Sequence, residues 1–323
     1  MRLALLTLLS LAPMVAAQAQ DPTRIEALAP ILQAEDRRVL DVGVLGPALE
    51  HPDPLVRRIA ATAIGRIGNA DGLVLLAPRL NDPDRDVVAD VIFAMGLLKD
   101  RRAVPLLLDR LRSSDSLATP ALVEAATALA RIGGPDAARI LADVMRGSGD
   151  ILEARRVEMR GVAVQESWRL GPDAPIDAIV PFARDTSVSK RWYALYALSR
   201  LNHPAVADLA LAAASERVAL LREVAARGLT RRIADSAGVS PGTAIAALLP
   251  LLDDEARGVR ISALSALASH RDSSVADRVA GRLRDNDRSV RVAAAQALAA
   301  SGGKASAVAL AARFDDAGEE WAV

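Results

Sequence analysis

One helical pattern recurs along this chain and constrains its fold more than any other feature. The clearest copy is Leu55 to Gly68, LVRRIAATAIGRIG, in which small and apolar residues recur at steps of three and four. This spacing places them on one side of a helix. The polar residues left outside are Arg57, Arg58, Thr62 and Arg66. Asp53 and Pro54 supply a helix start, Gly68 supplies an end, and a second helix is expected around Leu73 to Leu80.

Equivalent small positions recur along the chain at intervals of 31 to 38 residues. Aligned on the first copy they are Ala60, Val91, Ala125, Ala163, Ala194, Ala225, Ala263 and Ala294. A column three places further on is also mostly Ala, which lets neighbouring helices approach closely. Intervals of this size are typical of stacked helical hairpins, which bury their apolar faces against their neighbours. We predict an all-α, right-handed α-solenoid of about eight hairpins over residues 51–314, preceded by capping helices over 20–50.

A second column of this alignment is rich in arginine. Its members are Arg57, Val88, Leu122, Arg160, Arg191, Arg222, Arg260 and Arg291, and acidic residues precede most of them. We favour a structural interpretation, in which each arginine binds turn carbonyls and carboxylates of the next repeat. The alternative is an anion-binding surface, whose field the nearby acidic residues would largely cancel.

Composition excludes several classes of partner and of chemistry. Lys+Arg and Asp+Glu are equal at 40 each, so no overall charge attracts the chain to nucleic acid or to an anionic membrane. The chain has no cysteine, which excludes disulfides, thiolate catalysis and Cys-ligated zinc. We therefore expect a monomer that recognises a protein or peptide partner through local contacts.

The first residues have the features of a secretory signal. Arg2 is followed by the apolar run Leu3 to Val15, and Ala17-Gln18-Ala19 offers the small residues that a signal peptidase reads. The run is too short to cross ~30 Å of hydrocarbon, which argues against a membrane anchor. We predict a signal peptide over residues 1–19, and a periplasmic or secreted mature protein that is not inserted in a membrane.

The pattern D-P-x-V-R-x-x-A-x-x-A-[IL]-G-x-[IL]-G describes Asp53 to Gly68 and, more loosely, Asp287 to Ala300. It resembles HEAT repeats of the short bacterial kind found in phycobilisome-lyase-like proteins, and the resemblance covers nearly all of the mature chain. It implies an α-solenoid with a concave face used for binding. It specifies no activity, because such arrays occur in scaffolds, transport factors and accessory regions of enzymes.

The last nine residues look like the start of a further repeat. Asp315 to Glu320 resembles the acidic turn before a repeat, and Trp321 to Val323 the first residues of its helix, so residues 315–323 suggest a truncated repeat. The segment His51 to Arg58 also resembles the first repeat of arrays that precede the barrel of some cyclophilin-type peptidyl-prolyl isomerases. That resemblance implies isomerase activity only in sequence beyond Val323, since none of the barrel's residues is present.

The repeats differ most between Asp150 and Leu201, where five of the eight aromatic residues lie. These five are Trp168, Phe182, Trp192, Tyr193 and Tyr196. Trp192 and Tyr196 share one helix face, and Tyr196 occupies a column that is otherwise mainly polar, whereas Tyr193 is expected in the core. We predict that Trp192, Tyr196 and Arg200 form a partner-binding patch. The alternative is that the longer preceding loop buries these rings.

A further column of arginines extends this predicted surface. Its members are Arg66, Arg131, Arg169, Arg200 and Arg231. Cations are favourable at helix C-termini, so solvated helix-end charge is one explanation. The sharper hypothesis adds Arg169 and Arg231 to the partner-binding residues, where they would hold an acidic segment.

Motifs that would indicate chemistry have simpler explanations in this chain. Gly238 to Gly242 matches G-x-S-x-G, but Pro241 removes a backbone N–H of the oxyanion hole, so Ser240 is better explained as a helix N-cap. Asp82, Asp84 and Asp86 imitate a calcium loop without its Gly and Glu, and are expected to be turn and helix-start acids. The histidines, expected to cap helices or face solvent, are His51, His203 and His270.

We therefore predict no catalytic, cofactor-binding or metal-binding residues in this sequence. The function that fits is an exported HEAT-repeat scaffold that binds a protein or peptide on its solenoid surface. The alternative is the N-terminal array of a secreted peptidyl-prolyl isomerase.

Overall fold

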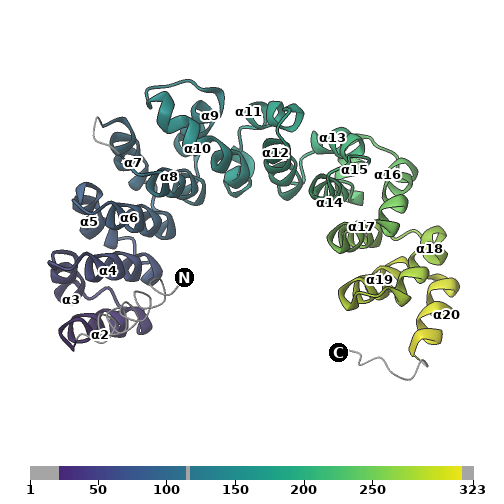
Figure 1. The fold of residues 1–323 in the computed structure, drawn as a ribbon, viewed down its shortest axis with the longest axis horizontal. Helices are drawn as coiled ribbons and strands as arrows, with labels where there is room; N and C mark the ends of the chain where they lie inside the picture. The colour runs from purple at the N-terminus through teal and green to yellow at the C-terminus, as the bar shows by residue number, and fades with distance from the viewer. Residues whose placement is uncertain (1–21, 114–116, 315–323) are drawn as a thin grey trace, which may run out of the picture. The chain divides into compact units, whose positions relative to one another are not determined.

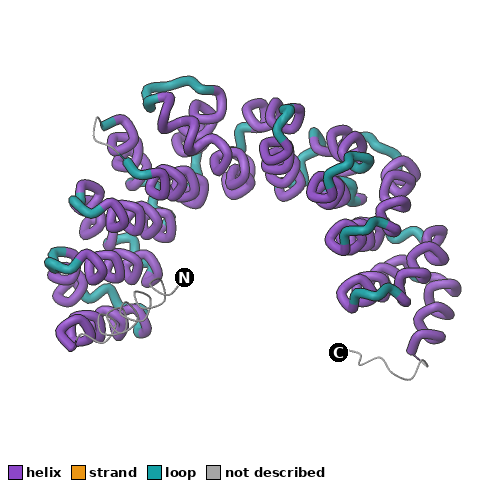
Figure 2. Tube along the Cα trace, in the orientation of Figure 1, coloured by secondary structure: helices purple, strands orange, loops and turns teal. Residues whose placement is uncertain are grey.

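The computed structural model describes residues 22–113 and 117–314. Over these two ranges the chain forms α-helices joined by short 3₁₀ turns and loops, and contains no β-strand (Figure 2). It divides into two compact units, the first ending at Ala174 and the second beginning at Pro175. The helices of each unit stack as hairpins, which confirms the prediction of an all-α solenoid.

The first unit contains nine α-helices and two 3₁₀ segments among its described residues. They are α2 (Pro22–Asp36), α3 (Val42–Leu49), α4 (Pro54–Ile67), α5 (Gly72–Leu76), η1 (Ala77–Asn81), α6 (Arg85–Leu98), α7 (Ala103–Arg112), α8 (Thr119–Ile132), α9 (Pro135–Arg146), α10 (Glu153–Glu166) and η2 (Ser167–Asp173).

The second unit continues the same pattern with shorter second helices. Its elements are α11 (Ile176–Ile179), η3 (Val180–Arg184), α12 (Val188–Arg200), α13 (Val206–Ala213), α14 (Ala219–Arg227), α15 (Arg231–Ala237), α16 (Pro241–Leu248), η4 (Leu249–Asp253), α17 (Arg257–His270), η5 (Ser273–Val275), α18 (Ala276–Ala280), η6 (Gly281–Arg284), α19 (Arg288–Ser301) and α20 (Gly303–Phe314).

Each unit has two layers of helices (Figure 1). In the first unit one layer is formed by α4, α6, α8 and α10, each of which packs on the next. In the second unit the corresponding layer is α12, α14, α17 and α19. The second helices of the hairpins, such as α9 on α8 and α13 on α14, cover the back of these layers. Within each unit the core therefore lies between the two layers.

The template helix α4 begins and ends where its sequence indicates. Asp53 caps it by accepting a hydrogen bond from the Leu55 N–H, Pro54 is its first residue, and Gly68 leaves it in the left-handed region with φ 76°. One expectation for this helix was wrong. Arg57 was assigned to the outer side, yet only 8% of it is exposed.

The aligned small positions form the core, as predicted. All eight members of the column that contains Ala60 are fully buried, including Val91. In the column three places further on, Glu166 alone is not buried, and it pairs with Arg169 instead. Small residues are needed because neighbouring helices approach closely: a Cβ added at Gly96 would lie 2.8 Å from the Ala128 Cα.

Arg57 is buried because it connects one repeat to the next. Its Nε and Nη2 donate to the two carboxylate oxygens of Asp82, at 2.9 and 2.8 Å. Its Nη1 donates to the carbonyls of His51 and Pro52 in the turn before its own helix. Asp82 also accepts from the Asp84 N–H, so one carboxylate organises the next turn and holds the preceding arginine.

The same arrangement recurs in the second unit. Arg222 donates from Nε and Nη2 to Asp254 and from Nη1 to two turn carbonyls. Arg260 shares the contact of Nη1 with two turn carbonyls but reaches Asp285 through Nη2 alone, and its Nε has no partner among the described residues. Arg57, Arg222 and Arg260 form what we call the arginine ladder, and at these three positions they confirm the structural interpretation of the arginine column. Where Val88 and Leu122 stand in that column, the side chains are buried and apolar.

We expect the ladder to make the second unit sensitive to acid. Burial by itself raises the pKa of Asp254, but hydrogen bonds from Arg222 and from the Ala256 N–H outweigh it, so this pKa lies below its ordinary 3.8. A carboxyl whose folded pKa is depressed stabilises the fold above its ordinary pKa and loses that contribution as pH falls through the folded value. Asp254→Asn should therefore cost about 1.5 kcal/mol at pH 6.

Urea unfolding of the wild type and Asp254→Asn between pH 6 and pH 2.5 measures this effect. The difference between the two proteins should be constant above pH 5 and shrink below pH 3.8. A difference that does not change with pH would show that the carboxylate charge of Asp254 does not contribute to stability.

Candidate functional site

The aromatic residues of α12 form a stack on the layer of first helices. The rings of Trp192 and Tyr196 lie parallel, with centroids 5.1 Å apart and planes inclined by 16°. Tyr193 meets Trp192 edge-on at 5.7 Å. All three residues are half-buried. The rings are therefore neither fully exposed nor covered, and Tyr193, expected in the core, is not fully buried.

The predicted arginines occupy three different elements. Arg200 is exposed at the end of α12, one turn after Tyr196. Arg231 is the first residue of α15 and pairs with Asp235 four residues later in the same helix. Arg169 belongs to the first unit, where it pairs with Glu166 and lies over the Trp168 ring at 4.4 Å. Within the second unit, Arg200 is thus the predicted arginine that shares a helix with the aromatic stack.

The first unit carries a polar group that sequence reasoning missed. Oε2 of Glu124 on α8 is buried and accepts no hydrogen bond from another described residue. Burial raises the pKa of this carboxyl, Asp90 and Glu166 add to the shift, and Arg131 opposes it. Asp90 and Glu124 occupy one column, in which most other repeats have apolar residues, so the alignment contained a signal for this group.

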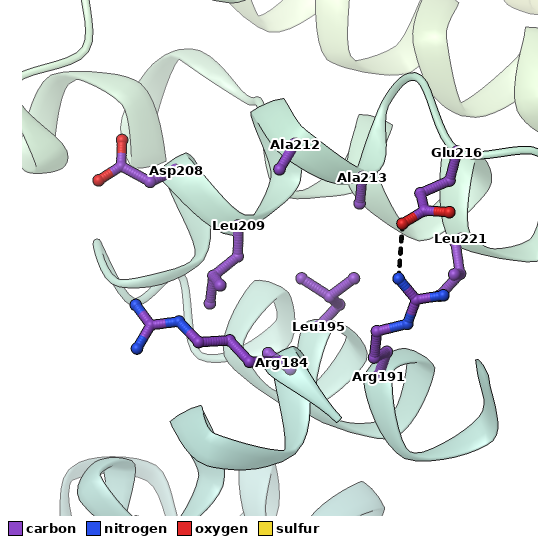
Figure 3. Close-up of a pocket in the computed structure, with 10 residues that line it drawn as sticks. Arg184, Arg191, Leu195, Asp208, Leu209, Ala212, Ala213, Glu216 and Leu221 are labelled. Atoms are coloured by element: carbon purple, nitrogen blue, oxygen red, sulfur yellow. Dashed lines mark hydrogen bonds and ion pairs between the residues drawn. The ribbon is translucent and has the colours of Figure 1, made fainter. Parts of the chain in front are cut away.

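A hollow of about 320 Å³ lies in the second unit between α12, α13 and α14 (Figure 3). Its apolar part includes Leu195, Leu209 and Leu221. Arg184 and Asp208 stand at one end, and the paired Arg191 and Glu216 at the other. Sequence reasoning missed this hollow because it depends on α13, and the short second helices show no recognisable register.

Two motifs that were rejected as chemical sites have the structural roles expected of them. Ser240 caps α16, with its Oγ accepting from the Thr243 N–H at 3.1 Å, and Pro241 is the first residue of that helix. Asp84 caps α6 by accepting from the N–H groups of Asp86 and Val87.

The histidines divide into two groups. Nδ1 of His51 and of His203 accepts a backbone N–H two residues later, but that N–H belongs to the N-cap residue of the next helix, Asp53 or Ala205, so both histidines stabilise the turn before a helix and do not cap the helix as expected. His270 differs from the expectation of a cap or an exposed group: it is only 4% exposed, and its Nε2 lies 2.9 Å from the Leu229 carbonyl. The reason is its position at the end of α17, where it packs against the preceding repeat.

Residues 22–113 and 117–314 contain neither a cluster suited to a metal ion nor a helix suited to a membrane. In that part of the chain, no group of three acidic or histidine side chains is placed to hold a metal ion. None of its helices is both long enough and apolar enough to span a bilayer.

The repeat geometry and the arginine ladder agree with a comparison to known families. A family model for HEAT repeats matches residues 40–125, 75–156 and 245–322, which together make up more than half of the chain. The chain belongs to the HEAT-repeat family. No curated protein sequence matches the chain.

Several solved structures share this fold. A homology model of the full-length AP-3 complex matches with TM-score 0.56 and 12% identity, over 90% of this chain and 57% of the other. Kap95p, in a structure with RanGDP, matches with TM-score 0.54 and 13% identity, over 89% and 46%. Kap121p bound to Pho4p matches with TM-score 0.50 and 16% identity, over 86% and 35%.

At these identities the likeness concerns the HEAT-repeat fold alone. The chain spans about a third to just over half of the length of these three proteins. A HEAT array is a scaffold architecture, in which stacked hairpins present a long surface and each repeat can carry different side chains on it. Function must therefore be argued from what particular repeats display.

Proposed function

We propose that this chain is an exported HEAT-repeat scaffold that binds a protein or peptide partner through Trp192, Tyr196 and Arg200. The observation that carries the proposal is the stacked, half-exposed pair of rings on α12. At the two equivalent positions of α4 the template repeat has Arg58 and Thr62. This repeat thus displays aromatic area where the template displays polar groups.

The chemistry of these three side chains suits partner binding. Trp and Tyr offer large, rigid contact surfaces, and with Arg they are the residues most enriched in binding hot spots. The stack holds each ring in place before a partner arrives, which lowers the entropy lost on binding. Arg200 lies one helical turn beyond Tyr196, where its guanidinium can hold a partner carboxylate beside the rings.

The scaffold's export is supported by the sequence of its first residues. A basic Arg2, the apolar run Leu3 to Val15 and the small residues before Gln20 have the order of a cleavable secretory signal. The partner is therefore expected in the periplasm or outside the cell. Among solved HEAT-fold structures, Kap95p with RanGDP and Kap121p with Pho4p are examples of such arrays with protein partners.

Replacing both Trp192 and Tyr196 by Ala is expected to weaken partner binding at least about tenfold, since a lost hot spot costs more than 1 kcal/mol. The bait is produced with its own leader, recovered from the periplasm as a chain that begins at Gln20, and used to capture partners from cell-envelope extract. Captured proteins are identified by mass spectrometry, and their affinities for both baits are then measured by calorimetry.

The matched control is Val292→Ala/Gln296→Ala in α19, which changes the same two columns in another repeat. Val292 is 41% exposed and Gln296 is exposed, so the control changes accessible side chains at the same two columns without removing an aromatic ring. It should bind like the wild type. The proposal is wrong if the Trp192/Tyr196 variant loses thermal stability but keeps full partner affinity, or if the control loses as much affinity.

A further inference from the structure

The hollow of about 320 Å³ beside α12 has the form of a side-chain pocket. It lies on the side of the helix that carries Arg191 and Leu195, whereas the aromatic stack lies on Trp192 and Tyr196. Leu195 and Leu221 are buried at its base, and Leu209 on α13 is half-buried above them. Figure 3 shows Leu209 and Leu195 in the middle, Arg184 and Asp208 toward one end, and Leu221 beside the Arg191–Glu216 pair at the other.

The Arg191–Glu216 pair borders one end of this hollow and is held by fewer hydrogen bonds than the pairs of Arg57 and Arg222. Arg57 and Arg222 each use three nitrogens, two on a carboxylate and one on turn carbonyls. Arg191 holds Glu216 through Nη1, and its buried Nε has no hydrogen-bond partner among the described residues. Arg260 likewise has a buried Nε without a partner among the described residues and holds Asp285 through Nη2 alone, so this looser contact occurs twice in the second unit; beside Arg191 it borders the hollow.

Two accessible charges flank the other end of the hollow. Arg184 at the end of η3 and Asp208 on α13 are both exposed. In the part of the chain that the structure describes, neither makes an ion pair with the other or with a third residue. A guanidinium donor and a carboxylate acceptor that face one opening without pairing can bind the C=O and the N–H of one peptide unit.

We propose that this hollow binds an extended peptide segment, with a Leu, Ile or Met side chain in its apolar part and the peptide backbone between Arg184 and Asp208. We infer a peptide because each residue of an extended chain offers one side chain, one C=O acceptor and one N–H donor. These match the apolar cavity, the Arg184 guanidinium and the Asp208 carboxylate of the site. The inference rests on the proposed function in assuming a protein or peptide partner, but it uses a different face of α12.

The test uses capped tripeptides and methyl NMR on the full mature chain. The probes are acetyl-Gly-Leu-Gly-amide and, as a matched polar probe, acetyl-Gly-Ser-Gly-amide. The leucine peptide should shift the methyl signals of Leu195, Leu209 and Leu221 saturably, with a Kd in the millimolar range expected for so small a ligand. The serine peptide should leave these signals unchanged at the same concentrations.

Two variants connect the shifts to the hollow. Ala212 lines it and is exposed, so Ala212→Trp fills the opening without disturbing the core, and should abolish the shifts. Arg184→Ala/Asp208→Ala keeps the apolar cavity but removes the donor and the acceptor, and should weaken the leucine peptide at least about fivefold because two hydrogen bonds to charged groups are lost. The proposal is overturned if the leucine peptide gives no saturable shift, if the serine peptide binds equally, or if Ala212→Trp binds like the wild type.

The experiments distinguish failure of the peptide-binding hollow from failure of the aromatic partner-binding patch. Trp192→Ala/Tyr196→Ala should bind the leucine tripeptide like the wild type, because its substitutions lie outside the hollow. If tripeptide binding is absent while that variant still loses its captured partner, the hollow is not a peptide site and the aromatic patch stands.

Discussion

Asp82→Ala is expected to lower the free energy of unfolding of the first unit by about 3–5 kcal/mol. The Asp82 side chain is 1% exposed and that of its partner Arg57 is 10% exposed. Removing the carboxylate leaves a buried guanidinium whose charge is no longer compensated, and also removes the acceptor for the Asp84 N–H. Urea unfolding at pH 7, followed by circular dichroism at 222 nm, measures the loss.

A solvent-exposed ion pair between α4 and α6 supplies the control. Arg58 and Asp86 are 3.4 Å apart, with side chains 38% and 68% exposed, so Asp86→Ala should cost less than about 1 kcal/mol. Arg57→Leu/Asp82→Ala should recover part of the loss, because both charges then leave the interface together. If Asp82→Ala is as stable as the Asp86 control, the ladder does not hold these repeats together.

The core of this protein could be predicted from its sequence because every repeat buries the same positions. Ala60 and its equivalents are fully buried in all eight copies, so the register of one copy fixes the others. The burial of Arg57 could not be read from the same pattern. Helical periodicity treats arginine as a polar residue, and its partner lies 25 positions away in the next turn.

The candidate site was predictable only in part. The sequence placed Trp192 and Tyr196 one turn apart on a helix, and the structure adds that their rings stack and are half-buried. Tyr193 was expected in the core because it aligns with Ile59, but both residues are half-buried. The prediction was wrong because it counted the alignment column of Ile59 and Tyr193 as part of the buried face of the helix. The hollow could not be predicted from the sequence, because α13 forms one of its walls and the second helices of the repeats cannot be aligned with one another as the first helices can.

Gly65→Ala is the second substitution for which we expect a large effect, a destabilisation of about 2–3 kcal/mol. Gly65 is buried in α4 where that helix packs on α6. A Cβ at this position would lie 2.6 Å from the Ala94 Cα and 2.9 Å from its Cβ, so the two helices must move apart. This strain outweighs the gain of about 1 kcal/mol that Ala brings to a helix interior. Thermal and urea unfolding measure the result.

The same substitution at Gly46 is the matched control. Gly46 lies inside α3 with nothing within 4 Å of an added Cβ, so Gly46→Ala should stabilise the protein by about 0.5–1 kcal/mol. A second-site change separates side-chain crowding from backbone crowding. Ala94→Gly removes only the Cβ contact, and because the shorter distance is to the backbone, it should not rescue Gly65→Ala. Full rescue would mean that the helices can shift at this contact, and that the small-residue columns do not fix the spacing of the stack.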